Sequence, residues 1–195
     1  NEAGMGPVST GEARNGAWTM AFQEGAAYLD QQDFSAAVEY FEMANELYSR
    51  RPEGFMNLAV ALQSTGDING SIQAWYDAVG VMENPEFTPE DPQDAAQWSS
   101  YLPMSRGNLG SLLSSIPERS EEAIDILQLV VEDDPSNSSA QGTLAMLLAQ
   151  SGAGDDAMAI FDEILSDETG SWQDYYNAGI TLYQAEDWNR SALAF

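Results

Sequence analysis

Residues 18–44 read WTMAFQEGAAYLDQQDFSAAVEYFEMA, and residues 52–78, 34 positions further on, read PEGFMNLAVALQSTGDINGSIQAWYDA. Small and large residues occur in the same order in both stretches, at Gly25 and Ala59, Tyr28 and Leu62, Ala37 and Ser71, Phe41 and Trp75, and Ala44 and Ala78. Apolar residues recur at i, i+3, i+4 and i+7, which is the period of a helix and not of a strand. The two stretches therefore predict one helix–turn–helix unit that is used twice.

The same order of residues returns towards the C-terminus. Its markers are Asn108-Leu109-Gly110, Ala123, Leu127 and Val130, then Leu144, Ala145, Leu148, Ala157, Phe161 and Ile164, then Asn177-Ala178-Gly179, Leu182 and Trp188. Turn residues separate the expected helices at Gln32-Asp33, Gly66-Asp67, Gly152-Ala153-Gly154 and Glu186-Asp187. We expect Asp67 and Asp187 to cap the second helix of their units.

This pattern resembles the tetratricopeptide-repeat (TPR) family, whose unit is a 34-residue helix–turn–helix with small and aromatic residues at fixed positions. The resemblance covers residues 18–195 and implies an all-α, right-handed solenoid. The expected repeats are 18–51, 52–85, 103–137, 138–171 and a partial repeat, 172–195.

Two segments fall outside these repeats. Residues 1–17 are polar, Gly-rich and without periodicity, so we expect a flexible N-terminal arm. Residues 86–102 form an insert in which Asp91 and Pro92 predict the start of one extra helix, over 93–101. The insert is either a spacer or a docking edge.

Composition excludes several kinds of function. The chain has 32 acidic residues against 6 arginines, with no Lys, and a net charge of −26, whereas nucleic-acid binding requires a basic surface. It has no Cys and no His, which removes thiol chemistry and the commonest general base and metal ligand. Adjacent acids on a helix do not face each other. We therefore expect no enzyme activity, no catalytic residue, no cofactor and no metal site.

The strongly acidic surface has two interpretations. It keeps the protein soluble, or it is an adaptation to salt. Complete absence of Lys favours an extracytoplasmic, periplasmic or secreted, location or a salty one, and a first residue that is not Met fits either a removed export signal or a trimmed sequence. The alternative is the cytoplasm of a salt-adapted organism. No apolar run approaches the ~20 residues of a membrane-spanning helix, so no membrane insertion is expected.

The TPR resemblance also implies where a partner binds. In that family the first helices of successive repeats line a concave groove, and an Asn at the sixth position can bond the backbone of an extended peptide. The groove residues expected here are Phe22, Met56, Asn57, Asn108, Met146, Tyr176, Asn177 and Tyr183. None is basic, which argues against an acidic C-terminal tail as ligand and favours an extended or helical segment with apolar anchors. If the register shifts by one residue, Phe22, Met56 and Met146 become core residues.

Two functions remain open. The first is a scaffold that binds a segment of a partner protein in the groove and organises an assembly. The second is a structural subunit that associates with itself, stacking end to end into rings or filaments. Leu193 and Phe195 would form that assembly edge, because the sequence stops midway through an expected helix. Either the natural chain continues there or another chain covers the edge.

The charge leads to a first testable prediction. At ~1 M salt the Debye length is only ~3 Å, so the repulsion within a surface of net charge −26 is screened. We expect the melting temperature, followed by circular dichroism, to rise steadily from low to molar NaCl. A melting temperature that does not change over this range would contradict salt adaptation.

Overall fold

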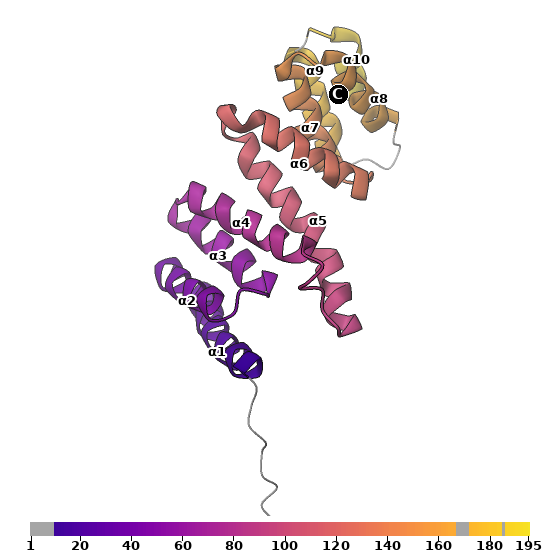
Figure 1. The fold of residues 1–195 in the computed structure, drawn as a ribbon. Coiled ribbons are helices and arrows are strands. Elements are labelled where there is room, and N and C mark those ends of the chain that lie inside the picture. The colour runs from indigo at the N-terminus through magenta and orange to yellow at the C-terminus, as the bar shows by residue number, and fades with distance from the viewer. Residues whose placement is uncertain (1–9, 167–171, 185) are drawn as a thin grey trace, which may run out of the picture. The chain divides into compact units, whose positions relative to one another are not determined.

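The computed structural model describes residues 10–166, 172–184 and 186–195. Over these ranges the chain forms helices joined by short connections, with no strand (Figure 1). The helices are α1 (Thr10–Asp30), α2 (Phe34–Leu47), α3 (Pro52–Thr65), α4 (Ile68–Glu83), α5 (Pro92–Ser114), the 3-10 turn η1 (Pro117–Arg119), α6 (Ser120–Asp133), α7 (Ser138–Ser151), α8 (Gly154–Ser166), α9 (Trp172–Gln184) and α10 (Trp188–Ala194).

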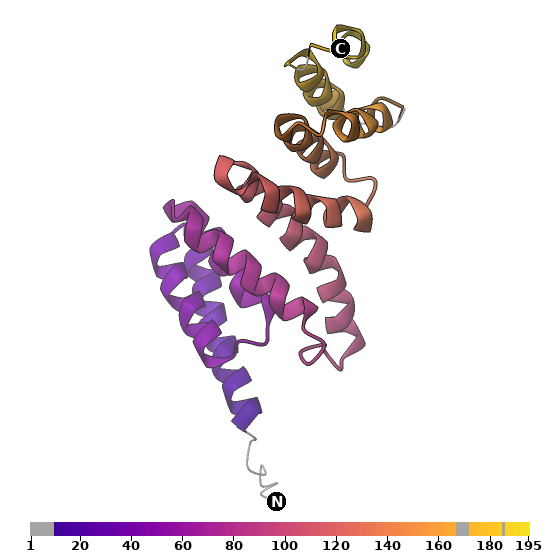
Figure 2. The ribbon, with the colours of Figure 1, turned by 45° about the horizontal axis from the view of Figure 1, so that its top comes forward.

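The chain divides into two compact units, residues 1–105 and 106–195, with the division inside α5. In the first unit α1 packs on α2, α2 on α3 and α3 on α4, as two neighbouring hairpins (Figures 1 and 2). In the second unit α6 packs on α7, α7 on α8 and α9 on α10, and α9 also contacts α7 and α8. Helices contact their near neighbours in sequence, as in a solenoid. The predicted all-α helix–turn–helix fold is confirmed.

Four of the turns between paired helices have the same backbone geometry. A residue with positive φ follows the first helix, and the next N–H bonds back to a carbonyl in the last turn of that helix. Gly66 and Gly152 supply two of these positive φ angles, 88° and 91°, whereas Gln32 and Glu186 adopt 61°. A side chain in this left-handed conformation costs roughly 1–2 kcal/mol. Packing of the paired helices therefore imposes the turn even where no glycine is present.

The residue after the turn caps the second helix in most of the repeats. The Oδ1 atom of Asp67 accepts the N–H of Gly70 at 2.9 Å, and that of Asp187 accepts the N–H of Arg190 at 3.1 Å. Both predicted caps are confirmed. Asp33 does the same for α2. A cap of this kind is worth about 1 kcal/mol, so each turn both stops one helix and starts the next.

In three of the repeats a large side chain of the second helix packs on a glycine of the first. The aromatic ring of Phe41 would lie 2.8 Å from a Cβ atom added to Gly25, and Leu127 would lie equally close to one added to Gly110. Phe41 is fully buried, and Trp75 and Phe161 occupy the same position in their repeats and are also buried. The repeated order of small and large residues is therefore the pattern of contacts between paired helices.

The structure differs from the sequence expectation at residues 10–17. These residues belong to α1, which begins at Thr10, while residues 1–9 of the expected arm lie outside the described part of the chain. A contact distant in sequence explains the extension. The guanidinium Nε of Arg51 donates a hydrogen bond to Asn15 Oδ1 at 3.1 Å and so ties the start of α1 to the α2–α3 connection.

The insert also differs from expectation. Its predicted helix continues without a break into the first helix of repeat three, to form α5. Pro103 lies inside α5, where a proline usually costs about 3 kcal/mol because it removes a backbone hydrogen bond. Trp98, before the proline, and Leu109, after it, are both buried. Burial of apolar side chains on both sides of Pro103 offsets that cost.

A glycine substitution tests the proposed contact between paired helices. We expect Gly25→Ala to lower the free energy of unfolding by about 1–3 kcal/mol, because the new methyl group would overpack against Phe41. Gly80, in α4, has no atom within 4 Å of its would-be Cβ atom, so Gly80→Ala is the matched control and should raise stability by roughly 0.5–1 kcal/mol. Urea unfolding by circular dichroism measures both, and equal effects would contradict the packing argument.

Candidate functional site

The expected groove residues of the first unit are largely engaged in packing and local bonding. Phe22 stacks on Trp18 with ring centres 4.7 Å apart and lies 5.6 Å from the ring of Phe41. Met56 is buried, with 8% of its surface exposed. The side-chain amide of Asn57 donates to the carbonyl of Glu53 in its own helix at 2.8 Å. Met56 is therefore buried, whereas Phe22 and Asn57 remain partly exposed, and their contact with a partner stays a prediction.

The second unit holds a more open surface at the equivalent helices. A pocket of about 330 Å³ lies between α7 and α9, the first helices of consecutive repeats. The residues that line it are Ser138, Ser139, Gly142, Thr143, Met146, Ile180, Thr181 and Gln184. None of these lining residues is ionisable. The pocket has a small, neutral, hydrogen-bonding surface with two apolar points, Met146 and Ile180.

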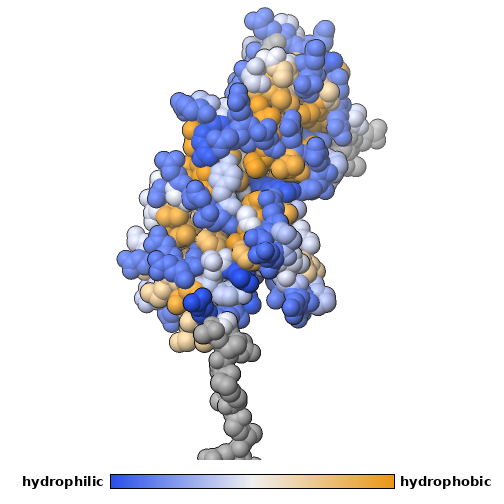
Figure 3. Space-filling model, in the orientation of Figure 1, coloured by the Kyte–Doolittle hydropathy of each residue, from blue (hydrophilic) through white to orange (hydrophobic). Residues whose placement is uncertain are grey.

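Helix α9 carries a row of large exposed side chains beside this pocket. Trp172 is 73% exposed and Tyr183 58% exposed, and Tyr176 and Ile180 lie exposed between them at helical spacing. Tyr183 contacts Trp188 edge to face at a centroid distance of 4.8 Å. The viewed face of the second unit shows apolar patches among polar side chains (Figure 3). Exposed aromatic residues next to a pocket are typical of protein-binding surfaces.

Four other expected site residues have different surroundings. Asn108 is exposed on α5, and the side chain of Asn177 lies outside the described part of the structure. Phe195 packs against Tyr176 and over Gly179, yet 69% of it is exposed, in contrast to the buried Phe41. Leu193 is also exposed. The two residues of the expected assembly edge therefore present apolar surface at α10.

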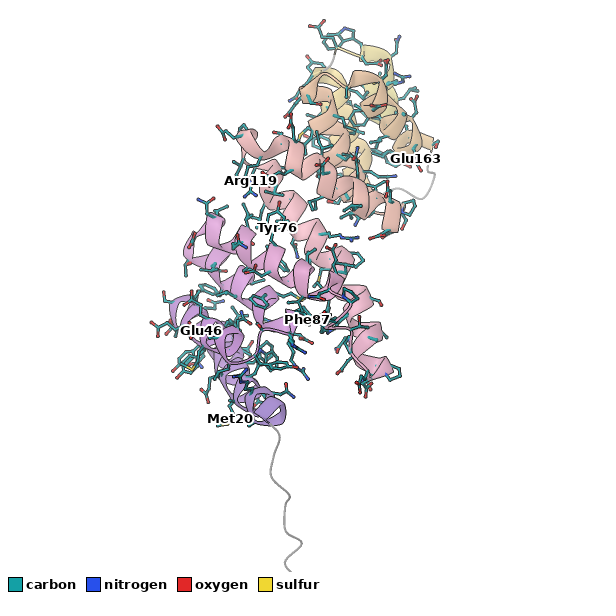
Figure 4. The ribbon with its side chains drawn as sticks, viewed as in Figure 1. Met20, Glu46, Tyr76, Phe87, Arg119 and Glu163 are labelled. Carbon is teal, nitrogen blue, oxygen red and sulfur yellow. The ribbon has the colours of Figure 1, made fainter. Side chains whose placement is uncertain are left out.

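A second cavity, of about 310 Å³, lies in the first unit and was not expected from the sequence. It is formed where the start of α1, the α2–α3 connection and the segment 87–98 meet. Figure 4 marks Phe87 in the connection between α4 and α5, and the guanidinium carbon of Arg50 lies 4.9 Å from the centre of its ring. The guanidinium of Arg51 lies 5.0 Å from the ring of Trp18. The one sequence signal is the pair Arg50-Arg51, two adjacent cations in a chain with only six.

Glu53 lines this cavity, and its carboxyl has a shifted pKa. Burial raises the pKa of its carboxyl above the ordinary 4.5. A backbone hydrogen bond and Arg51 act in the opposite direction, and the nearby Asp94 adds to the rise. Its Oε2 atom is shielded from solvent and accepts no hydrogen bond from the described residues. Burial and the charge of Glu53 also raise the pKa of Tyr101.

Across the described ranges, no group of three or more Asp and Glu side chains is placed to hold a metal ion. None of the described helices combines the length and apolar character needed to cross a bilayer.

The repeated helix hairpins, the shared geometry of their turns and the pocket between the first helices of two repeats define an α-helical repeat protein. Tetratricopeptide-repeat profiles match residues 22–84 and 118–178, which together exceed half of the chain. The chain belongs to the tetratricopeptide-repeat family, whose members are in general non-catalytic scaffolds for binding other proteins.

Solved structures share this fold at low sequence identity. A MamA protein has a TM-score of 0.72 at 17% identity, with 93% of this chain and 89% of that one covered. MamA residues 41 to the end, from Desulfovibrio magneticus RS-1, give 0.71 at 14% identity, covering 92% and 91%. YrrB, described as a TPR protein with an unusual peptide-binding site, gives 0.66 at 18%, covering 94% and 89%. A search of curated proteins found no match.

The raised pKa of Glu53 makes the free energy of unfolding depend on pH in a defined direction. Because the folded-state pKa lies above the unfolded value, stability is lost as pH rises through the window that begins at 4.5. We expect Glu53→Gln to melt higher than the parent at pH 7, with the difference shrinking at pH 4. Exposed Glu39→Gln is the control. A difference in melting temperature that is the same at both pH values would contradict this assignment.

Proposed function

We propose that this chain is a non-catalytic scaffold that binds a segment of a partner protein in the pocket between α7 and α9. The observation that carries the proposal is the pocket itself, where Met146 and Ile180 lie among small polar groups and beside the exposed row on α9. A side chain of medium size, such as Leu or Met, fits the volume of about 330 Å³. Tyr176 and Tyr183 then contact the residues that flank it.

The neutral lining of the pocket and the net charge of the chain together determine which class of partner segment is proposed to bind. The lining of the pocket is neutral, so it offers no counter-ion for a buried carboxylate or ammonium group. The whole chain carries −26, which attracts basic residues that stay in solvent at the rim. The proposed ligand is therefore an extended or helical segment with one or two apolar anchors and Lys or Arg on either side. YrrB, which shares the fold, is itself described as binding peptide.

A substitution that fills the pocket tests this function without weakening the fold. Gly142 lines the pocket and has no atom within 4 Å of its would-be Cβ atom, so Gly142→Leu places a side chain into the binding space. Twelve-residue peptides selected by phage display on the parent chain should carry apolar anchors with basic flanks. We expect Gly142→Leu to weaken their binding at least tenfold, or about 1.4 kcal/mol, in fluorescence polarisation.

The control is Gly80→Leu, which changes a helical glycine with equally open surroundings in the other unit. It should leave peptide affinity unchanged, and both variants should melt at or above the parent temperature. Peptides that bind Gly142→Leu as tightly as the parent, or a selection that enriches no peptide, would exclude this pocket as the binding site.

A further inference from the structure

The cavity of the first unit has a chemistry that the proposed groove does not have. Its lining combines aromatic side chains, Tyr48, Phe87 and Trp98, with several ionised groups. Trp98 is buried, whereas Tyr48 and Phe87 are partly exposed. The volume of about 310 Å³ is enough for one long side chain or a small molecule, and it lies wholly within one unit.

Acidic groups outnumber basic ones in this lining. Two arginines, Arg50 and Arg51, face four acids, which are Glu53, Glu90, Asp91 and Asp94. The guanidinium groups of the two arginines rest on aromatic rings, and Arg51 also donates to Asn15. Asp91 accepts the backbone N–H of Gln93 at 2.7 Å, at the start of α5. The cavity therefore retains a surplus of negative charge.

The surplus negative charge of the cavity is concentrated at Glu53. One oxygen of its carboxylate is shielded from solvent and accepts no hydrogen bond within the described chain, although Arg51 lies close enough to lower its pKa. Asp94 repels it, and Tyr101 is near enough to respond to its charge. A carboxylate that is poorly solvated and beside a like charge is stabilised when a cation enters the adjacent space.

We propose that this cavity binds the guanidinium or ammonium group of a basic side chain, Arg or Lys, on a protein segment. Glu53 and Asp94 neutralise the charge, and the accessible faces of Tyr48 and Phe87 contact the aliphatic stem and the cationic head. An organic cation fits better than a metal ion, because the carboxylates of the described chain form no cluster of three metal ligands. The site is independent of the groove between α7 and α9.

The test uses amino-acid amides as probes on the whole chain at about 0.15 M salt, where surface attraction is screened beyond about 8 Å. N-acetyl-arginine amide and N-acetyl-lysine amide are titrated against the ¹⁵N-labelled protein, with N-acetyl-leucine amide and N-acetyl-glutamate amide for comparison. We expect saturable shifts for the two basic probes, confined to the indole N–H signals of Trp18 and Trp98 and to the backbone amides of Arg51 and Glu53. The dissociation constant should rise at least fivefold in Glu53→Gln.

Two controls separate this site from other binding. Glu39→Gln removes an exposed charge elsewhere in the same unit, and Gly142→Leu blocks the groove of the other unit, so neither should change the dissociation constant. If the pocket between α7 and α9 proves not to bind peptide, the result for the cavity of the first unit is therefore unaffected. Equal binding of acidic and basic probes, no saturation, or an unchanged affinity in Glu53→Gln would overturn the site. If spermidine bound far more tightly than N-acetyl-arginine amide, the assignment of a protein side chain as the ligand of this cavity would be overturned.

Discussion

The contact between a large side chain and a glycine, found across three of the helix pairs, is the constraint on which the rest of the structure depends. Phe41 lies over Gly25, Leu127 over Gly110 and Phe195 over Gly179, at distances that leave no room for a side chain on the glycine. This close approach fixes the separation of the paired helices. It also explains why the turns keep one geometry even where Gln32 and Glu186 must adopt positive φ.

The regular part of the fold could be predicted from sequence because its determinants lie within one repeat. The caps at Asp67 and Asp187 follow from residues at a turn, and helix starts at Pro52, Ser138 and Trp172 coincide with the expected repeat boundaries. Prediction failed where distant residues decide the outcome. Asn15 extends α1 through its bond to Arg51, and the burial of Trp98 and Leu109 carries α5 past Pro103.

The same distinction applies to the two candidate sites. Family positions select Met146, Tyr176 and Tyr183 because every repeat presents the same face of its first helix. Met146 lines the pocket and both tyrosines are exposed, whereas their contact with a partner stays a prediction. Whether Phe22 and Met56 line the groove or join the core was left open by the sequence, because packing depends on the volume of their neighbours. In the structure Phe22 stacks on Trp18 and Met56 is buried. The charged cavity has no periodic signal at all. Its lining comes from residues 11 to 98 and includes the insert, so only the folded chain brings these groups together.

The few arginines of this chain, whose net charge is −26, have different roles in the two units. In the second unit they form ion pairs between helices: Arg106 with Asp133, and Arg190 with Asp162 at 2.8 Å. Around the cavity of the first unit, Arg50 and Arg51 instead rest on aromatic rings, although acids line the same space. Arg51 partly compensates the charge of Glu53, but the two guanidinium groups together do not balance the four acids of the cavity. The cavity therefore keeps more acidic than basic groups, which is the basis for proposing that it binds a cation, whereas the lining of the pocket between α7 and α9 holds no ionisable residue and is proposed to select by shape and apolar contact.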